Sequence, residues 1–402
     1  MSYKRLGDYI QPVNIRNKEL WVTTLLGVSV KKIFIPSIAN TIGTDFKKYK
    51  IVKKHQFVYI PDTSRRGDKI GIAMLEEYEK ALVSQAYSVF EIKDQNKLLS
   101  EYLMMWFRRP EFDRYARYKS HGSVREIFDW DEVCDIELPI PSIEKQQQIV
   151  AEYNTVTNRI KLNENLNQKL EETAQALYKH WFVDFEFPNA EGKPYKSSGG
   201  EMVFDEELEK NIPVGWRFGV FKDIANITMG QSPKGDTYNF INEGVALVNG
   251  PVEFGKYFTK EIKWTSSPTK KCEEKDLIVC VRGSTVGRFV KSDGIYCIGR
   301  GVCSIKGKYS QCFVDEFYKS SLNELRNSTT GSTFPSWDRN YISSFNTIVP
   351  TIDVQTLFEK KCNQISSLIL IKSAENENLK EITTMILAKM VKIETIPKTQ
   401  AV

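Results

Sequence analysis

Residues that could perform chemistry are few in this sequence, and they are scattered. Asp62 and the later run Glu91-Ile92-Lys93 could supply the short PD…ExK pattern whose carboxylates hold Mg²⁺ in nucleases. The second part of that pattern recurs at Glu261-Ile262-Lys263, so it arises easily by chance. The sequence has three histidines, His55, His121 and His180, and they lie far apart along the chain. Scattered histidines are more often surface or core residues than catalytic ones. We therefore predict no catalytic residue and no metal site.

Motifs for nucleotide-driven or methyl-transfer chemistry are also missing. The sequence has no G-x-x-x-x-G-K-[ST] loop, no G-x-G-x-x-G loop and no Asn/Asp-Pro-Pro-aromatic tetrapeptide. Its seven cysteines include no C-x-x-C pair, which argues against a disulfide framework and a zinc site. No apolar run approaches the 18 or so residues that span a bilayer, and the start of the chain lacks an apolar signal region. We predict a cytoplasmic protein that uses no cofactor.

Polar and basic loops suited to DNA remain. Arg65-Arg66-Gly67 and Arg282-Gly283-Ser284 each follow a strand-like run, and glycine beside arginine permits close approach of the backbone to a ligand. Arginine can read guanine with two hydrogen bonds. Each loop taken alone could equally be a plain turn. The predicted DNA-binding residues are Arg65, Arg66, Lys69, His121, Ser123, Gln231, Ser232, Lys234, Arg282, Ser284, Arg288, Thr330 and Ser332.

Positive charge is concentrated in two separate blocks, although the net charge is only +5. Residues 1–75 carry fourteen Lys and Arg against five Asp and Glu, and residues 256–308 carry twelve against five. Residues 142–181 are neutral, with five of each kind. Two basic blocks favour a polyanionic ligand, because cations that neutralise phosphates release counterions. Ordinary solvated surface is the alternative.

The chain contains an internal repeat with a period of about 209 residues, and a repeat of this kind constrains the whole fold. Residues 138–150 resemble residues 347–359, with Pro141 matching Pro350 and Gln146 matching Gln355. Gly122-Ser123 matches Gly331-Ser332 at the same offset, whereas Trp130-Asp131 and Trp337-Asp338 are displaced by two residues. Each repeat predicts a strand-rich α/β segment followed by a long helix.

Two long segments, residues 142–181 and Ile352 to Met390, contain no glycine or proline, which predicts two uninterrupted helices. Ser142 is the expected N-cap of the first helix, which would extend about 60 Å. In each helix, residues with a mean spacing of 3.5 form a stripe along one side, which we call the seam. The seam is apolar at both ends of the helix and polar in the middle. Antiparallel packing would bring Asn167 close to the stretch Lys372–Asn376. Two unrelated amphipathic helices, each packed on its own domain, are the alternative.

The segment Ala176–Phe185 (ALYKHWFVDF), preceded by IPSIEKQQQIV and followed by an acidic stretch and Gly215-Trp216, resembles the central region of type I restriction–modification specificity subunits. The loop MGQSPKG at 229–235 resembles the start of their second recognition domain. The resemblance implies an α/β fold with two pseudo-symmetric target recognition domains and two long antiparallel coiled-coil helices. One departure is that the second helix ends in MILAKMVKIE and lacks the Trp-Phe pair of the first.

The repeat and the resemblance together predict a domain plan, and the resemblance also implies partners. Residues 186–211 are acidic and bear Gly, Pro and Ser, which predicts an exposed linker between the halves. The predicted parts are a first recognition domain (1–141), a central helix (142–185), a linker (186–212), a second recognition domain (213–350), a C-terminal helix (351–392) and a tail (393–402). The expected partners are double-stranded DNA, two methyltransferase subunits and motor-nuclease subunits, and the chain itself would be non-catalytic. Tyr178, Trp181 and Phe182 are candidates for partner binding, with core packing as the alternative.

Two other functions remain open. The chain could be the recognition half of a self-contained fused methyltransferase–nuclease, and methyltransferase motifs on a neighbouring reading frame would argue against that. It could also be a helical scaffold without affinity for DNA, which leaves the two basic segments unexplained. For a specificity subunit, two unlike domains in one chain predict a bipartite DNA target that is not a palindrome. A rigid helix pair should fix its gap, with half-site centres about one helical turn, near 10 base pairs, apart.

Overall fold

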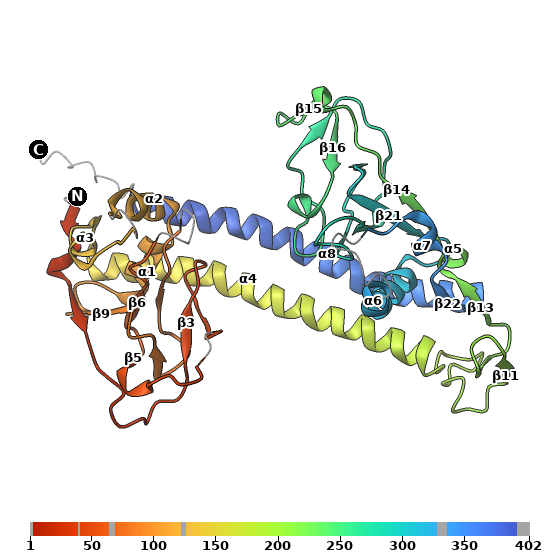
Figure 1. The fold of residues 1–402 in the computed structure, drawn as a ribbon, viewed down its shortest axis with the longest axis horizontal. Helices are drawn as coiled ribbons and strands as arrows, with labels where there is room; N and C mark the ends of the chain where they lie inside the picture. Colours follow the sequence, from red (N-terminus) through yellow and green to blue (C-terminus); the bar gives the residue numbers. More distant parts are fainter. Residues whose placement is uncertain (1–2, 39–40, 64–68, 122–125, 328–335, 392–402) are drawn as a thin grey trace, which may run out of the picture. The chain divides into compact units, whose positions relative to one another are not determined.

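The computed structural model describes residues 3–38, 41–63, 69–121, 126–327 and 336–391. The chain divides into two compact units. Unit 1 comprises residues Met1–Lys161 and Glu377–Val402, and unit 2 comprises Leu162–Asn376. Each unit contains one α/β domain and part of two long helices, α4 (Ile143–Tyr178) and α8 (Ile352–Lys389) (Figure 1). The mixed α/β class and the long helices confirm the predicted fold class.

Unit 1 is built around a four-stranded antiparallel sheet in the order β2-β9-β6-β7. Alternate residues of β6 serve two cores: Phe57 and Tyr59 point into one apolar cluster, and Val58 points into the other. The first cluster includes the buried faces of the helices, and the second is closed by two small sheets, so the central sheet is covered on both faces. The strands and helices of the central layers are β2 (Ile10–Val13), β6 (Phe57–Tyr59), β7 (Ile72–Met74), β9 (Ser88–Ile92), α1 (Ser100–Arg108), α2 (Pro110–Lys119) and α3 (Trp130–Cys134).

Short strand pairs complete unit 1. They pair as β1-β10, β3-β4 and β5-β8, all antiparallel. The single turn η1 carries Leu6, which is fully buried and anchors the start of the chain in the core. The elements are β1 (Tyr3–Arg5), η1 (Leu6–Asp8), β3 (Leu26–Val28), β4 (Phe34–Pro36), η2 (Phe46–Lys48), β5 (Lys50–Lys53), β8 (Lys80–Val83) and β10 (Glu137–Pro139).

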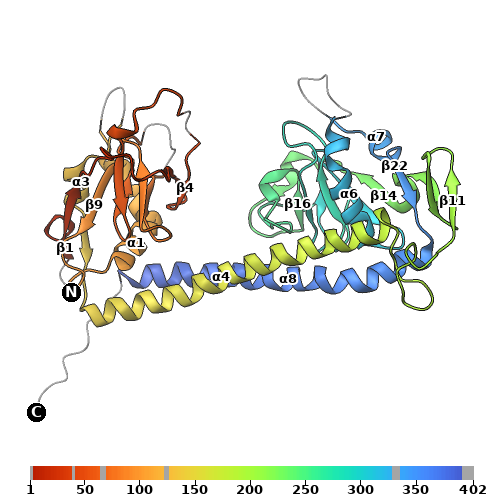
Figure 2. The same cartoon turned by 90° about the horizontal axis from the view of Figure 1, so that it is seen from below.

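Unit 2 repeats this plan. Its central antiparallel sheet has the order β14-β21-β18-β19, and alternate residues of β18 again divide between two clusters. Leu277 faces the helices, and Ile278 faces a second sheet. The elements are β13 (Arg217–Val220), α5 (Phe221–Ile224), β14 (Ala225–Met229), β18 (Leu277–Cys280), β19 (Phe289–Lys291), β21 (Val302–Gly307), α6 (Gln311–Asn327), α7 (Arg339–Ser343) and β22 (Asn346–Val349) (Figure 2).

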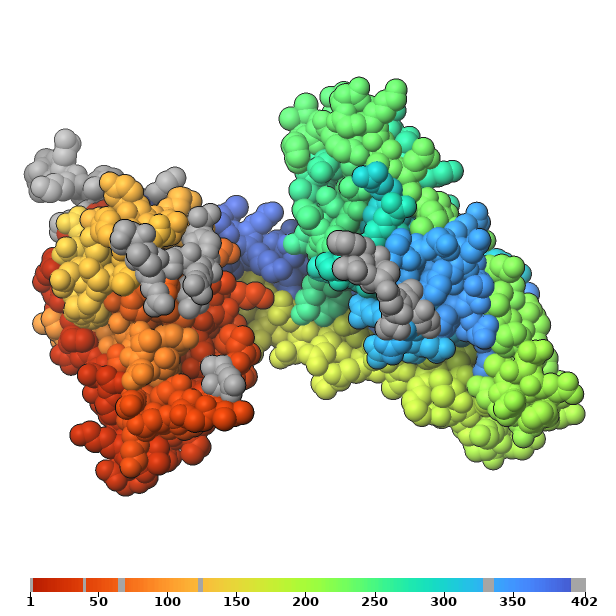
Figure 3. All heavy atoms as spheres, viewed as in Figure 1, coloured from red at the N-terminus to blue at the C-terminus, as the bar shows by residue number. Residues whose placement is uncertain are grey.

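The second sheet of unit 2 has the order β15-β17-β16-β20, and β16 pairs with β20 in parallel. Part of it forms a lobe that projects from the rest of this unit, green at the top of Figure 3. The elements are η4 (Gly235–Thr237), β15 (Tyr238–Asn239), β16 (Val245–Val248), η5 (Pro251–Glu253), β17 (Trp264–Thr265) and β20 (Cys297–Ile298).

The acidic stretch that we predicted to be an exposed linker is more ordered than expected. It contains the hairpin β11 (Met202–Asp205) and β12 (Lys210–Pro213), paired in antiparallel register. Phe187 stacks on both Tyr195 and Trp216, with ring centroids 4.5 and 5.1 Å apart. These aromatic contacts bury apolar surface, and this accounts for the order of a segment whose charge and Gly/Ser content predicted a linker.

The two units have the same order of strands in their central sheets, and the internal repeat extends to single hydrogen bonds. Gln146 and Gln355 are both buried, and each donates a side-chain hydrogen bond of 2.9 Å to the carbonyl of the proline five residues earlier. The structure corrects one part of the predicted alignment. Asp129 caps α3 and Asp338 caps α7, so the 209-residue offset holds here without the displacement of two residues.

The predicted seam is the buried stripe of both long helices, and their antiparallel packing is confirmed within unit 2. Asn163 donates to Asn376 (2.9 Å) and Asn167 donates to the Ser373 hydroxyl (3.2 Å), near the predicted position. At the other end of these segments, the rings of Trp181 and Phe358 lie 5.5 Å apart. Separately, in unit 1, Ile149 and Tyr153 of α4 share a core with Ile386, Leu387 and Met390 near the end of α8.

Candidate nucleic-acid interface

One rim of the central sheet in unit 2 gathers four turns that are distant in sequence. The amide of Gly230 donates to Val302 (3.0 Å), and the amide of Val281 donates to Gly301 (2.9 Å). The amide of Gly299 donates to Val248 (2.8 Å), which adds the end of β16. The turns 230–235, 249–250, 281–288 and 299–301 therefore lie at the same rim. We call this set the unit 2 rim.

The unit 2 rim is positively charged. It carries Lys234, Arg282, Arg288 and Arg300, all of them exposed, and its four turns contain no Asp or Glu. Asp236 directly follows the first of these turns and is exposed. Glu253, three residues after the turn 249–250, is buried and accepts from the amides of Asn249 and Gly250. Four exposed cations against one exposed acid at its edge, Asp236, give a surface that suits phosphates and guanine edges.

Most of the residues predicted for DNA binding in the second half meet at this rim. Arg282, Ser284 and Arg288 lie in the turn between β18 and β19, with Gly283 at φ 79°. Gln231, Ser232 and Lys234 lie in the turn after β14, where the amide of Gln231 donates to Ile298 (2.9 Å). Thr330 and Ser332 lie outside the described residues. Ser336, which follows that segment, pairs with Arg282 through the backbone.

In unit 1 the equivalent rim is only partly described. Lys69 and His121 are exposed, and the Nε2 of His121 lies 3.8 Å from the Glu132 carboxylate. Arg65, Arg66 and Ser123 lie outside the described residues. Backbone hydrogen bonds join the segment before the first of these loops to the segment after the second. The amide of Thr63 donates to Glu126 (2.9 Å), and the amide of Phe128 donates to Pro61 (2.9 Å). The predicted loops therefore leave the sheet from adjacent points.

Arg282 is not the equivalent of Arg65 or Arg66 in the repeat. The backbone of Arg282 pairs with Ser336, as the backbone of Asp62 pairs with Ile127, so Asp62 is the equivalent of Arg282. The turn between β6 and β7 is longer than the turn between β18 and β19, and this difference in length misaligned the two arginine loops in the sequence. The carboxylate of Glu91, which could have completed a PD…ExK site, accepts from Gln11 (2.8 Å) and Gln56 (2.7 Å).

Sequence reasoning missed two residues of the unit 2 rim, Asn249 and Arg300. Both are exposed. The run Gly299-Arg300-Gly301 carries the same signal of arginine beside glycine that drew attention to Arg282. Asn249 has no comparable signal, since only the pairing of β16 with β20 brings it to the rim.

The aromatic residues predicted to bind a partner lie in the core of unit 2. α4 continues into the π-helical turn η3 (Lys179–Val183), and Tyr178, Trp181 and Phe182 are all less than a tenth exposed. The ring of Phe182 lies 4.5 Å from that of Phe313 and 5.0 Å from that of Phe358, so it joins α4, α6 and α8.

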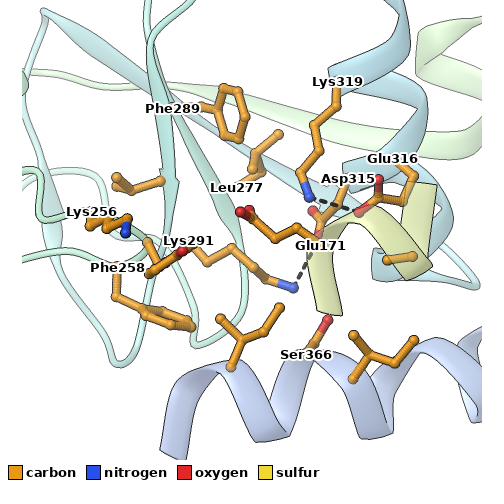
Figure 4. Close-up of a pocket in the computed structure, with 15 residues that line it drawn as sticks. Glu171, Lys256, Phe258, Leu277, Phe289, Lys291, Asp315, Glu316, Lys319 and Ser366 are labelled. Atoms are coloured by element: carbon orange, nitrogen blue, oxygen red, sulfur yellow. Dashed lines mark hydrogen bonds and ion pairs between the residues drawn. The ribbon is translucent and has the colours of Figure 1, made fainter. Parts of the chain in front are cut away.

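Charged residues line a cavity of about 60 Å³ where the unit 2 domain packs on α4 and α8 (Figure 4). Lys291 pairs with Asp315 (2.6 Å), and Lys319 pairs with Glu316 (2.7 Å). Burial opposes the charge of Lys291, but the Asp315 carboxylate outweighs it and raises the pKa of Lys291. Burial also raises the pKa of Glu316 and Glu171, against the opposing effect of Lys319. Both ion pairs lie within the domain, on β19 and α6, and Glu171 of α4 lines the same cavity.

Comparisons with known proteins agree with one another. Residues 9–172 match a family model described as the type I restriction modification DNA specificity domain. The chain is 26% identical over 299 residues to the type I restriction enzyme MjaIX specificity subunit of Methanocaldococcus jannaschii, covering 68% of this chain and 66% of that one. It is 23% identical over 416 residues to the type I restriction enzyme HindI specificity subunit of Haemophilus influenzae, covering 88% and 89%.

A solved structure shares the fold. The S subunit of a type I restriction–modification system from M. genitalium matches with a TM-score of 0.58 at 12% identity, over 98% of this chain and 96% of that one. At that identity the match concerns the fold alone. Within the part of the chain that the structure describes, no helix has the length and apolar character to cross a membrane.

Proposed function

Because this chain belongs to the DNA specificity subunits of type I restriction–modification enzymes, we propose that it reads a bipartite, asymmetric DNA target with its two domains. Specificity subunits recognise DNA and are non-catalytic, and methyltransferase and restriction subunits carry the enzymatic activities. In the proposed division of labour, residues 1–141 read one half-site and residues 213–350 read the other. Residues 142–185 and 351–392 form the helical connection, with 186–212 as a connecting segment and 393–402 as a tail.

The observation that carries this proposal is the repeated sheet with unlike loops. The order β2-β9-β6-β7 in unit 1 matches β14-β21-β18-β19 in unit 2, so both domains present their loops at the same rim of the same scaffold. The turn between β6 and β7 and the turn between β18 and β19 differ in length and sequence. Loops carried on a rigid scaffold can vary without disturbing the core, and unlike loops should read unlike sequences.

We also propose that the long helices dock two methyltransferase subunits, which in turn recruit motor-nuclease subunits. Tyr178, Trp181 and Phe182 would contribute indirectly, because their rings are buried and hold the end of α4 against α6 and α8. The neutral charge balance of residues 142–181 suits a protein partner better than DNA.

Selection of duplexes from a random-sequence DNA library by the purified full chain tests this function. The selected duplexes should share two short, unlike motifs at a fixed separation. Sequencing of methylated positions in cells that express the chain with its partner genes should return the same motifs. The purified chain alone should transfer no methyl group and cut no DNA. A continuous palindromic target, or methyl transfer by the chain alone, would refute the proposal.

A further inference from the structure

Arg300 lies between two glycines that closely approach Asn249 at the end of β16. A Cβ atom on Gly301 would lie 2.2 Å from the carbonyl oxygen of Asn249, and one on Gly299 would lie 2.1 Å from the Asn249 side-chain oxygen. Both distances are far below van der Waals contact. Because the clash at Gly301 is with backbone, only glycine fits there, whereas at Gly299 the Asn249 side chain would have to move. The turn is therefore packed tightly against the end of β16.

Hydrogen bonds fix the same turn from three directions. The amide of Arg300 donates to the Ser232 hydroxyl (3.2 Å), and the amide of Gly299 donates to Val248 (2.8 Å). The carbonyl of Gly301 accepts from Val281 (2.9 Å). The backbone of Arg300 is thus held by the turn after β14, by β16 and by the end of β18, at the centre of the unit 2 rim.

The Arg300 side chain, in contrast, is exposed, and no ion pair or hydrogen bond of its guanidinium is found among the described residues. Two exposed arginines outside the rim have such partners: Arg5 pairs with Asp135, and Arg217 pairs with Asp223. An arginine that is rigid at its base and unpaired at its tip can contact a ligand without first breaking an internal ion pair. It also loses less conformational entropy than one on a mobile loop.

We propose that Arg300 is a specificity-determining residue of the second recognition domain and reads a guanine in the major groove of the second half-site. The planar guanidinium donates two hydrogen bonds to O6 and N7 of guanine, a pattern that no other base presents. Lys234 and Arg288, on the surrounding turns, contact the flanking phosphates and orient the domain. This inference rests on the proposed function and adds that the second half-site contains a guanine at a position set by Arg300.

The test compares Arg300→Ala and Arg300→Lys with the wild-type full chain by duplex selection from a random-sequence library. The wild-type chain should select a guanine in the second half-site. Both variants should lose preference at that one position by about tenfold or more, while the first half-site stays unchanged. Arg300→Lys keeps the charge but not the two-pronged geometry, so its loss of preference separates base reading from attraction to phosphate.

Arg217→Ala is the matched control, since Arg217 is exposed in the same domain but lies away from the rim on β13 and pairs with Asp223. It should select the wild-type sequence. Equal weakening for all sequences in Arg300→Ala, with preference retained in Arg300→Lys, would make Arg300 a phosphate contact and overturn the inference, as would unchanged selection by both variants. If the wild-type chain selects no sequence at all, the proposed function itself fails.

Discussion

At the scale of single residues, position within the rim distinguishes arginines that can read DNA from those that support the fold. Arg117 pairs with Glu126, and Arg5 pairs with Asp135, so their charges stabilise local structure. Arg282 has its backbone fixed by pairing with Ser336 while its side chain is exposed. Charge alone did not separate these classes in the sequence, because local residue patterns do not reveal partners such as Asp135, which is 130 residues from Arg5.

Arg282→Ala should weaken binding to the selected duplex by about 1–3 kcal/mol if the guanidinium contacts a base, and Arg66→Ala should do the same in the first half. The measurement is a titration of the full chain against its selected duplex at fixed salt concentration. Arg217→Ala should bind with wild-type affinity. Wild-type affinity in both the Arg282 and Arg66 variants would mean that these loops are plain turns.

At the scale of elements, the two long helices were the most predictable part of the molecule. Absence of glycine and proline over residues 142–181, with apolar spacing of 3.5 residues, is sufficient to predict α4, and Ser142 lies at its start as expected. The π-helical turn at Lys179–Val183 was not predictable. Phe182 there packs on Phe313 and Phe358, which are more than a hundred residues away in the sequence.

The asparagine contact between α4 and α8 should stabilise their register. Asn163→Leu alone leaves the buried amide of Asn376 without its partner, which should cost about 1–3 kcal/mol in the free energy of unfolding. The double variant Asn163→Leu/Asn376→Leu should recover most of that loss, because both polar groups are removed. Denaturant unfolding measures both values, and Asn165→Leu at an exposed position is the control. A double variant as unstable as the single one would contradict this account of the pair.

Glu171 should destabilise unit 2 at neutral pH, since burial raises its pKa and its ionised form is disfavoured in the folded state. Glu171→Gln should therefore raise Tm by about 1–3 °C at pH 7–8. The gain should fade as the pH falls below 4.5, the ordinary pKa of a glutamate carboxyl, because the group then becomes protonated in both folded and unfolded states. Thermal unfolding across this pH range measures it.

The neighbouring exposed Glu172 is the control for this pH dependence. Hydrogen bonds from Lys169 and Gln168 lower the pKa of Glu172, so its ionised form is favoured in the folded state. Glu172→Gln should accordingly give no gain in Tm at any pH. A gain for Glu171→Gln that is independent of pH would show that its carboxyl is not the source of the effect.

At the scale of the whole molecule, the sequence predicted a duplicated architecture but not the composition of its binding rim. The repeat at Gln146 and Gln355 has a structural basis, because each side chain donates to the equivalent proline carbonyl of its own half. Arg300 and Asn249 were missed, because the sheet order that joins their turns cannot be read from local residue patterns. The local order of residues 186–212 was not predicted, because the aromatic contacts of Phe187 were not apparent from an acidic, glycine-bearing segment.

The central claim is that two domains of one chain each recognise their own half-site, and exchange of one domain tests it most directly. Residues 1–141 would be replaced by the matching segment of a relative with a different target, and the methylated sequences mapped in cells that also express the partner genes. Because the core of each domain is separate from its loops, the hybrid should keep the second half-site and acquire a new first one. A hybrid that alters both half-sites, or that leaves the first half-site unchanged, would contradict the account.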